Sequence, residues 1–227
     1  MYLLLLQAIV LYLISGYLHR SLSSSASKPL YVALMLPGTV IHESSHAAVA
    51  LLTGASIKTF SVMPSGDTLG RVEHTKPKIP VIGDFAISVA PLIGCPAVLV
   101  LAGYFLGLHF NYSPGSFDIL TETRYLLQGT LYFITALDYF SWKTYVFLYL
   151  ALALGAGAAP SRSDVTSMLP GLVIIVVAAF ALNYYGINIP YLYIVFSGLS
   201  AALSIAVVPL LAVTGFVAIL KLVAVLK

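Results

Sequence analysis

The chain has 227 residues, of which 60% are hydrophobic and 8% are charged. Soluble domains carry about 25% charged residues, and the mean hydropathy of this chain is +1.00. The composition therefore excludes a soluble globular domain and a disordered chain, and it predicts a single-domain integral membrane protein over residues 1–227. The net charge of +3 is too small to indicate a nucleic-acid partner.

Apolar segments recur along the chain, and most have about the 20 residues that a helix needs to cross a bilayer. We expect an all-α polytopic membrane protein with about six transmembrane helices, at residues 1–18, 30–53, 81–110, 142–158, 164–184 and 190–220. The first is interpreted as a retained helix and not a secretory signal, because no basic residues precede its apolar run. Residues 111–124 are expected to form a polar loop, and residues 125–140 a helix lying on the membrane surface.

The polar segment 54–80 separates the second and third predicted helices. Residues 56–63 alternate as in a short strand, and residues 70–74 read as a second strand after a turn at 64–67. The segment therefore predicts a small β-hairpin or a re-entrant segment. Such a hairpin could pair an extended substrate as an added strand, or it could be a plain surface hairpin, and the residues leave both open.

Lysines and arginines favour one predicted membrane face. With six spans, the face that holds both termini and segment 54–80 collects seven of them, against four on the other face. Cytoplasmic loops carry the excess of positive charge. We therefore expect a multi-pass protein of the cell membrane with both termini in the cytoplasm.

Three ionisable residues lie within five positions of the second predicted helix: His42, Glu43 and His46 form the pattern H-E-x-x-H. Ionisable groups at membrane depth are costly and are functional hypotheses by default. On a helix, positions i and i+4 share one face, so both imidazoles can bind one metal ion, and the glutamate can reach a water beside it. Zinc suits such ligands. The alternative is a polar cluster that joins helices.

A catalytic zinc ion needs a third protein ligand. Asp164 follows the helix breaker Pro160 and falls in the first turn of a predicted helix, where it could also form a capping box with Ser161. Glu122 is the rival ligand, in a polar loop. The remaining acidic and histidine residues are expected at the membrane interface or on the surface, namely Asp84, Asp138, Glu73, His74 and His109.

The zinc pattern and the small residues after it resemble the site-2 protease family of intramembrane zinc metalloproteases. Ser45 stands here where that family usually has glycine. Residues 88–94, Ser-Val-Ala-Pro-Leu-Ile-Gly, are similar to the family's alanine-glycine-proline segment, with Ala90 in place of glycine. The family's third ligand is an aspartate on a later helix near a break, the place that Asp164 holds, although the usual Asn-x-x-Pro and Leu-Asp-Gly signatures are absent.

The resemblance implies a metalloprotease core over residues 30–170, with additional transmembrane helices over 171–227. Because every loop between the predicted spans is short, we expect a minimal member with no inserted peptide-binding domain. It implies one Zn²⁺ per chain, held by His42, His46 and Asp164, and Glu43 as the general base of peptide hydrolysis. The implied substrate is a membrane-spanning protein or peptide, within the lipid bilayer. The residues do not identify substrate-binding positions, and they do not indicate an oligomeric state.

Three alternatives stay open on the sequence. One is a membrane gluzincin with Glu122 as the third ligand. Another is a non-catalytic membrane protein that binds or transports a metal ion, although the first and the last two predicted spans offer almost no polar residues for a path. The last is an inactive protease homologue, which the intact Glu43 disfavours.

Overall fold

The computed structural model describes residues 2–22, 28–63, 69–108, 119–185 and 190–225. In chain order, the elements are α1 (Tyr2–Leu22), α2 (Lys28–Leu52), β1 (Ile57–Ser61), β2 (Arg71–His74), α3 (Pro80–Leu106), α4 (Ile119–Thr135), α5 (Trp142–Ala158), α6 (Arg162–Tyr184) and α7 (Pro190–Val225). The described chain is mostly helical with one small two-stranded hairpin, which confirms the predicted fold class at that level.

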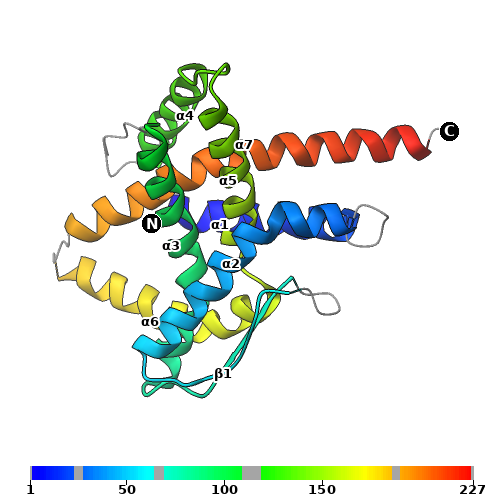
Figure 1. Ribbon diagram of the computed structural model, residues 1–227. Coiled ribbons are helices and arrows are strands. Elements are labelled where there is room, and N and C mark those ends of the chain that lie inside the picture. Colours follow the sequence, from blue (N-terminus) through cyan, green and yellow to red (C-terminus); the bar gives the residue numbers. More distant parts are fainter. Residues whose placement is uncertain (1, 23–27, 64–68, 109–118, 186–189, 226–227) are drawn as a thin grey trace.

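Helices α2, α3 and α5 pack against one another, and α6 packs along α3. Helix α7 packs against α1, α3 and α5 (Figure 1). Buried aliphatic and aromatic side chains join these helices, among them Leu99, Phe147, Leu154, Leu203 and Leu210. The core therefore lies between the helices of both halves of the chain and leaves α4 at its edge.

The helix ends follow local sequence signals. Helix α2 ends two residues before Gly54, which has a φ of 80°, and α3 begins at Pro80 and ends just before Gly107, which has a φ of 75°. Glycine adopts this left-handed conformation without the strain that a Cβ imposes. Helix α5 starts after Ser141, whose side chain accepts a hydrogen bond from the backbone N–H of Lys143. It ends just before Pro160, as the sequence indicates.

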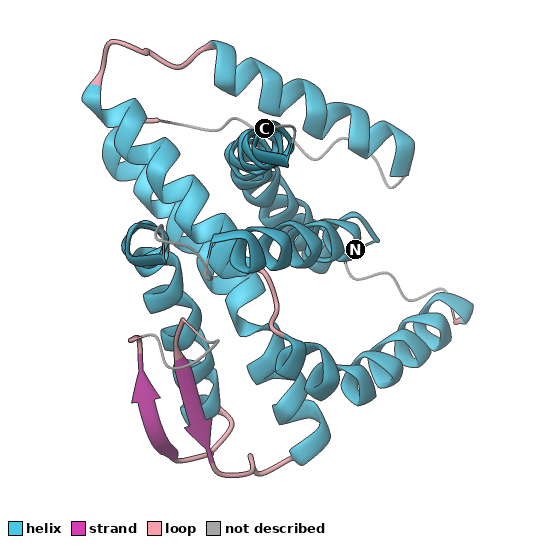
Figure 2. Ribbon diagram, turned by 90° about the vertical axis from the view of Figure 1, so that its right-hand side faces the viewer, coloured by secondary structure: helices cyan, strands magenta, loops and turns pink. Residues whose placement is uncertain are grey.

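Strands β1 and β2 pair in an antiparallel ladder, with Phe60 opposite Val72 and Ser61 opposite Arg71. Figure 2 shows the two strands side by side at one end of the molecule. The predicted turn at residues 64–67 lies outside the described residues. Because side chains alternate along a strand, Val72 and His74 share one face of β2, while Arg71 and Glu73 form an ion pair on the other.

Two helices of the described chain are long and apolar enough to cross a membrane, α3 and the segment 197–219 of α7. Helices α5 and α6 meet at a bend of 63°, and together residues 142–178 make a third candidate that is either a broken span or a re-entrant loop. Large apolar side chains of these helices are exposed, such as Leu101, Phe105 and Phe216. This surface suits contact with lipid and is consistent with a membrane protein.

Two sequence predictions need correction. Residues 119–124 were expected in a polar loop, but they begin helix α4, because leucine, glutamate and arginine are good helix formers. The surface helix was expected to reach residue 140, but it ends at Thr135. The Asp138 side chain accepts a hydrogen bond from the backbone N–H of Phe140, and this turn replaces the helix.

Candidate metal centre

Three side chains from two helices converge in the described structure: His42 and His46 of α2 and Asp164 of α6. The Nε2 atoms of the two imidazoles lie 3.0 Å apart. The Asp164 oxygens lie 3.4 Å from Nε2 of His46 and 3.7 Å from Nε2 of His42. His46 and Asp164 are buried, each with 8% of its surface exposed. One ligand atom of each side chain therefore faces a common point.

Backbone carbonyls fix the tautomer of both histidines. Nδ1 of His42 lies 2.6 Å from the carbonyl oxygen of Gly157, and Nδ1 of His46 lies 2.7 Å from that of Ile87. A carbonyl oxygen can only accept, so each Nδ1 carries the proton and donates it. When both rings are neutral, as metal ligands are, each directs an Nε2 lone pair into the same space. Two lone pairs at 3.0 Å repel each other unless a cation or a proton lies between them.

A proline in α3 makes the Ile87 carbonyl available. In a helix, this oxygen would accept a hydrogen bond from the N–H four residues later. Residue 91 is proline, which has no N–H to donate. The Ile87 oxygen can therefore accept a hydrogen bond from Nδ1 of His46. In this way Pro91, from the 88–94 segment, helps to position His46.

The break between α5 and α6 makes the second carbonyl available. The usual partner of the Gly157 oxygen would be the N–H of Ser161, but Ser161 lies beyond Pro160. The Ser161 N–H instead donates to Oδ2 of Asp164, at 2.7 Å, and Oγ of Ser161 accepts from the N–H of Asp164, at 3.1 Å. The capping box therefore exists, and it orients the Asp164 carboxylate towards the histidines. The two interpretations of Asp164 are compatible.

Small residues allow α2 and α5 to approach closely enough for this contact. A Cβ on Gly38 of α2 would collide with the Ala153 carbonyl of α5, and a Cβ on Gly157 would overlap Gly38. Small residues at helix crossings are typical of membrane proteins. The close crossing brings the Gly157 oxygen within reach of His42.

The structure also shows why serine is tolerated at position 45. Ser45 faces Gly94 of α3, where an added Cβ would collide with Oγ of the serine. The serine hydroxyl donates to the Ile41 carbonyl of its own helix, at 2.6 Å. A residue without a side chain on α3 therefore makes room for a larger residue on α2.

Glu43 is buried beside the cluster, with 7% of its surface exposed. Within the described part of the chain it forms no hydrogen bond or ion pair, although it interacts electrostatically with His46 and Asp164. A Cβ on Gly70 would lie 2.7 Å from Cγ and 2.8 Å from Oε1 of Glu43, so the chain entering β2 covers this carboxylate. A buried carboxylate beside potential metal ligands is costly and is therefore a candidate functional group.

A pocket of about 150 Å³ adjoins the cluster. His46 and Asp164 form part of its wall, and Val72 and His74 of β2 and Asp84 of α3 form other parts. We expected His74 on the surface, but it is half-buried and lines this pocket, because it shares the inner face of β2 with Val72. The alternation in β2 was the signal that could have placed it. Asp84, expected as an interfacial anchor, also lines the pocket.

The structure places the other candidates away from the cluster or does not describe them. The side chain of Glu122 and residue His109 lie outside the described residues. Helix α4, which carries Glu122, packs against α7 and α1, at the end of α3 opposite the hairpin (Figure 1). Asp138 lies in the turn between α4 and α5. Glu73 pairs with Arg71 on the outer face of β2.

Comparisons of the chain with protein-family models, with curated proteins and with solved structures found no match. The buried group of His42, His46 and Asp164 could hold a metal ion by its own geometry. The resemblance to site-2 proteases therefore depends on the quoted residues alone.

Proposed function

We propose that the protein is an intramembrane zinc metalloprotease of the site-2 protease type. The observation that carries the proposal is the cluster itself, in which two Nε2 atoms and a carboxylate face one point while both Nδ1 atoms are held by backbone carbonyls. Metal-binding histidines almost always donate their other ring N–H to a carbonyl or carboxylate in this manner.

Zinc is the metal that this set of ligands suits best. Structural and catalytic zinc sites use neutral imidazoles and carboxylates at about 2.0–2.2 Å in tetrahedral geometry, which places ligand atoms about 3.3 Å apart. The two Nε2 atoms lie 3.0 Å apart, and the Asp164 carboxylate lies 3.4 Å from His46 through Oδ1 and 3.7 Å from His42 through Oδ2, so the three side chains are close enough to share one ion. Three protein ligands leave a fourth position open, as in catalytic sites. A bound zinc ion would supply Lewis acidity towards a peptide carbonyl and towards water.

Glu43 is the residue that we assign to proton transfer. It adjoins His42 in sequence, is buried, and lacks a hydrogen-bond partner in the described structure, so its carboxylate is free to take a proton from water and return it to the leaving amine. The pocket that His46 and Asp164 share with β2 offers room beside the ligands for part of a substrate. Strand β2 could align an extended peptide there, which fits the need to unwind a transmembrane helix before cleavage.

The proposed setting is a multi-pass protein of the cell membrane with about six spans and both termini in the cytoplasm. Two or three of these spans agree with the apolar helices of the structure, and the excess of basic residues supports the orientation. The proposed substrate is a membrane-spanning protein or peptide, because the ligand helix α2 lies against the apolar span α3.

Two structural observations favour this function over its rivals. Helices α2 and α6, which carry the histidines and Asp164, both pack on α3. Helix α4, which carries Glu122, packs instead on α7 and α1, and this argues against the gluzincin alternative. Among the described polar residues of α1 and α7, Gln7 pairs with Ser200 and Ser204. These polar groups hydrogen-bond to one another, so they are less available to bind a metal ion along a transport path.

The test is cleavage of single-span model peptides labelled at both ends, by zinc-loaded wild type and Glu43→Gln. We expect wild type to release fragments, a chelator to stop the release, and Glu43→Gln to keep its zinc but lose cleavage by about 10²-fold or more. Equal cleavage by Glu43→Gln and wild type would refute the role of Glu43. Fragment release that persists in the chelator would refute the metalloprotease.

A further inference from the structure

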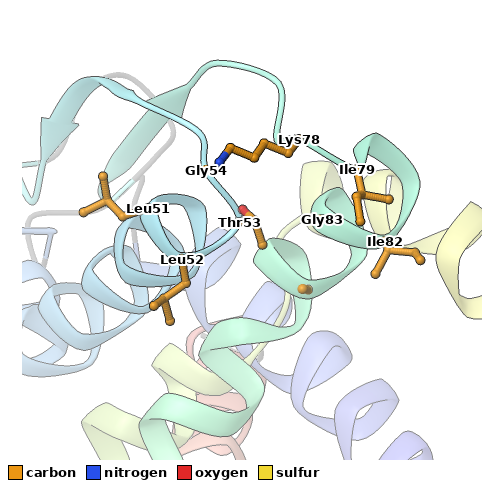
Figure 3. Close-up of a pocket in the computed structure, with 9 residues that line it drawn as sticks. Leu51, Leu52, Thr53, Gly54, Lys78, Ile79, Ile82 and Gly83 are labelled. Atoms are coloured by element: carbon orange, nitrogen blue, oxygen red, sulfur yellow. The ribbon is translucent and has the colours of Figure 1, made fainter.

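A second pocket, of about 390 Å³, opens between the end of α2 and the beginning of α3 (Figure 3). Leu51 and Leu52 line it from α2, and Ile79 and Ile82 line it at the start of α3. None of these residues belongs to the metal centre. The pocket is therefore a separate feature of the same end of the molecule.

The walls of this pocket are apolar and have no partner within the described chain that covers them. Leu51 is 60% exposed, Leu52 84%, Ile79 62% and Ile82 57%. Four large aliphatic side chains around one hollow form the kind of apolar patch that marks a binding surface. Their ligand must offer hydrocarbon to them.

A lysine is held at the rim of the pocket. The backbone N–H of Lys78 donates to the Thr53 carbonyl, at 3.1 Å, which ties the segment before α3 to the end of α2. The aliphatic stem of Lys78 lies across Gly54, where an added Cβ would come within 2.8 Å of three of its carbons (Figure 3). Lys78 is exposed and forms no ion pair with any described residue. Its ammonium group is available to an anion.

The position of the pocket along α3 identifies the level of the membrane. Lys78 lies two residues before Pro80, the first residue of a helix that is apolar enough to span a bilayer. Basic residues at the ends of spans lie among the lipid headgroups. Lys58 and Lys76 of the same segment are also exposed, so this end of the molecule is cationic. Anionic headgroups are attracted to such clusters.

We propose that this pocket binds one anionic phospholipid, with the headgroup phosphate on Lys78 and the first part of an acyl chain against Leu51, Leu52, Ile79 and Ile82. The chemistry of the site matches both ends of that ligand, a cation at the rim and hydrocarbon in the walls. The proposal depends on the membrane location alone, so it stands or fails separately from the metalloprotease.

The experiment uses the full chain in detergent and a photoactivatable phosphatidylglycerol with its reactive group near the start of an acyl chain. After irradiation, mass spectrometry maps the labelled peptides. We expect labelling at residues 51–54 and 79–86, weaker labelling by the matched phosphatidylcholine, and a fall of about five-fold in Lys78→Gln. Lys143→Gln is the matched control, because Lys143 is also exposed and lies at the start of a helix remote from the pocket, and it should label at these residues as wild type does.

Three results would overturn the proposal. They are equal labelling of this pocket by phosphatidylglycerol and phosphatidylcholine, wild-type labelling in Lys78→Gln, and loss of labelling when millimolar inorganic phosphate is added, which would show a simple anion site. Leu52→Gln supplies an independent variant and should reduce labelling of the pocket by both lipids. Circular dichroism of the same samples distinguishes loss of the lipid from loss of the fold.

Discussion

Pro91 shows how a single residue can position a metal ligand without touching the metal. Because it has no N–H, the Ile87 carbonyl is left to accept from Nδ1 of His46, at 2.7 Å. The proline was visible in the sequence as part of a family-like segment. Its role could not be derived there, because it depends on which side of α3 faces α2.

Pro91→Ala tests this role. The alanine supplies an N–H that competes for the Ile87 carbonyl, so His46 loses part of its orientation and zinc affinity should fall by about 10–100-fold. The measurement is a zinc titration against a competing chelator. Pro96→Ala is the control, because Pro96 is also buried within α3 but the carbonyl that it frees, Leu92, holds no ligand. Equal affinity in Pro91→Ala and wild type would contradict the role.

The Ser45–Gly94 contact makes a prediction about coupling between two residues. Gly94→Ala places a methyl group against Oγ of Ser45, and such overpacking costs about 1–3 kcal/mol. We expect Gly94→Ala to lower both thermal stability and zinc affinity, and Ser45→Gly to restore them in the double variant. A double-mutant cycle of thermal unfolding measures the coupling. Strictly additive effects would show that the two residues do not meet.

At the scale of elements, the break between α5 and α6 does two things at once. It ends α5 so that the Gly157 carbonyl can hold His42, and it starts α6 with a cap that orients Asp164. The sequence indicated the break and the cap from Pro160, Ser161 and Asp164. The close crossing of α2 and α5 through Gly38 and Gly157 was not predicted, because glycine also occurs in apolar helices where no neighbouring helix crosses closely.

The two functions of Asp164 can be separated by substitution. Asp164→Asn keeps an oxygen that accepts from the Ser161 N–H but removes the charge, so the fold should persist while zinc affinity falls by more than about 100-fold. Ser161→Ala removes the hydroxyl cap, which should cost about 1 kcal/mol of stability and leave zinc bound. Thermal unfolding and zinc titration of both variants give the comparison. The account is wrong if Asp164→Asn binds zinc as wild type does.

The sequence predicted the hairpin but not its contacts with the candidate metal centre. Alternation in segments 56–63 and 70–74 indicated two strands, and β1 and β2 lie within them. The chain at Gly70 covers Glu43, and β2 forms a wall of the pocket beside His46. These two contacts could not be predicted from the sequence, because they depend on how the hairpin packs on α2. Local patterns specify a strand, but its contacts come from the tertiary fold.

At the scale of the whole molecule, composition predicted a helical membrane protein, and the structure agrees at that level. The described helices include two or three that are long and apolar enough to span a membrane, so six spans and their orientation stay predictions. The division into a core at residues 30–170 and additional helices at 171–227 also stays a prediction. Helix α2, which carries His42, Glu43 and His46, is not among the helices apolar enough to span, because these polar residues lower its mean hydropathy.

The cluster of His42, His46 and Asp164 joins residues more than 100 positions apart. All three were predicted from the sequence as metal ligands. The i, i+4 spacing sufficed for the histidines, because helix geometry alone places them on one face. Asp164 was predicted as the third ligand from the family resemblance and from its place after a helix break. Its spacing alone could not distinguish a metal ligand from a helix cap. The structure shows the carboxylate in contact distance of both the cap and the histidines.

The most direct test of this account is the amount of zinc per chain in the purified, detergent-solubilised protein, measured by elemental mass spectrometry beside His46→Ala and Asp164→Ala. The account predicts about one zinc in wild type and its loss or strong weakening in both variants. Circular dichroism of each sample verifies that the helices are intact. Full zinc content in Asp164→Ala, or no metal in a folded wild type supplied with zinc, would contradict the metal centre.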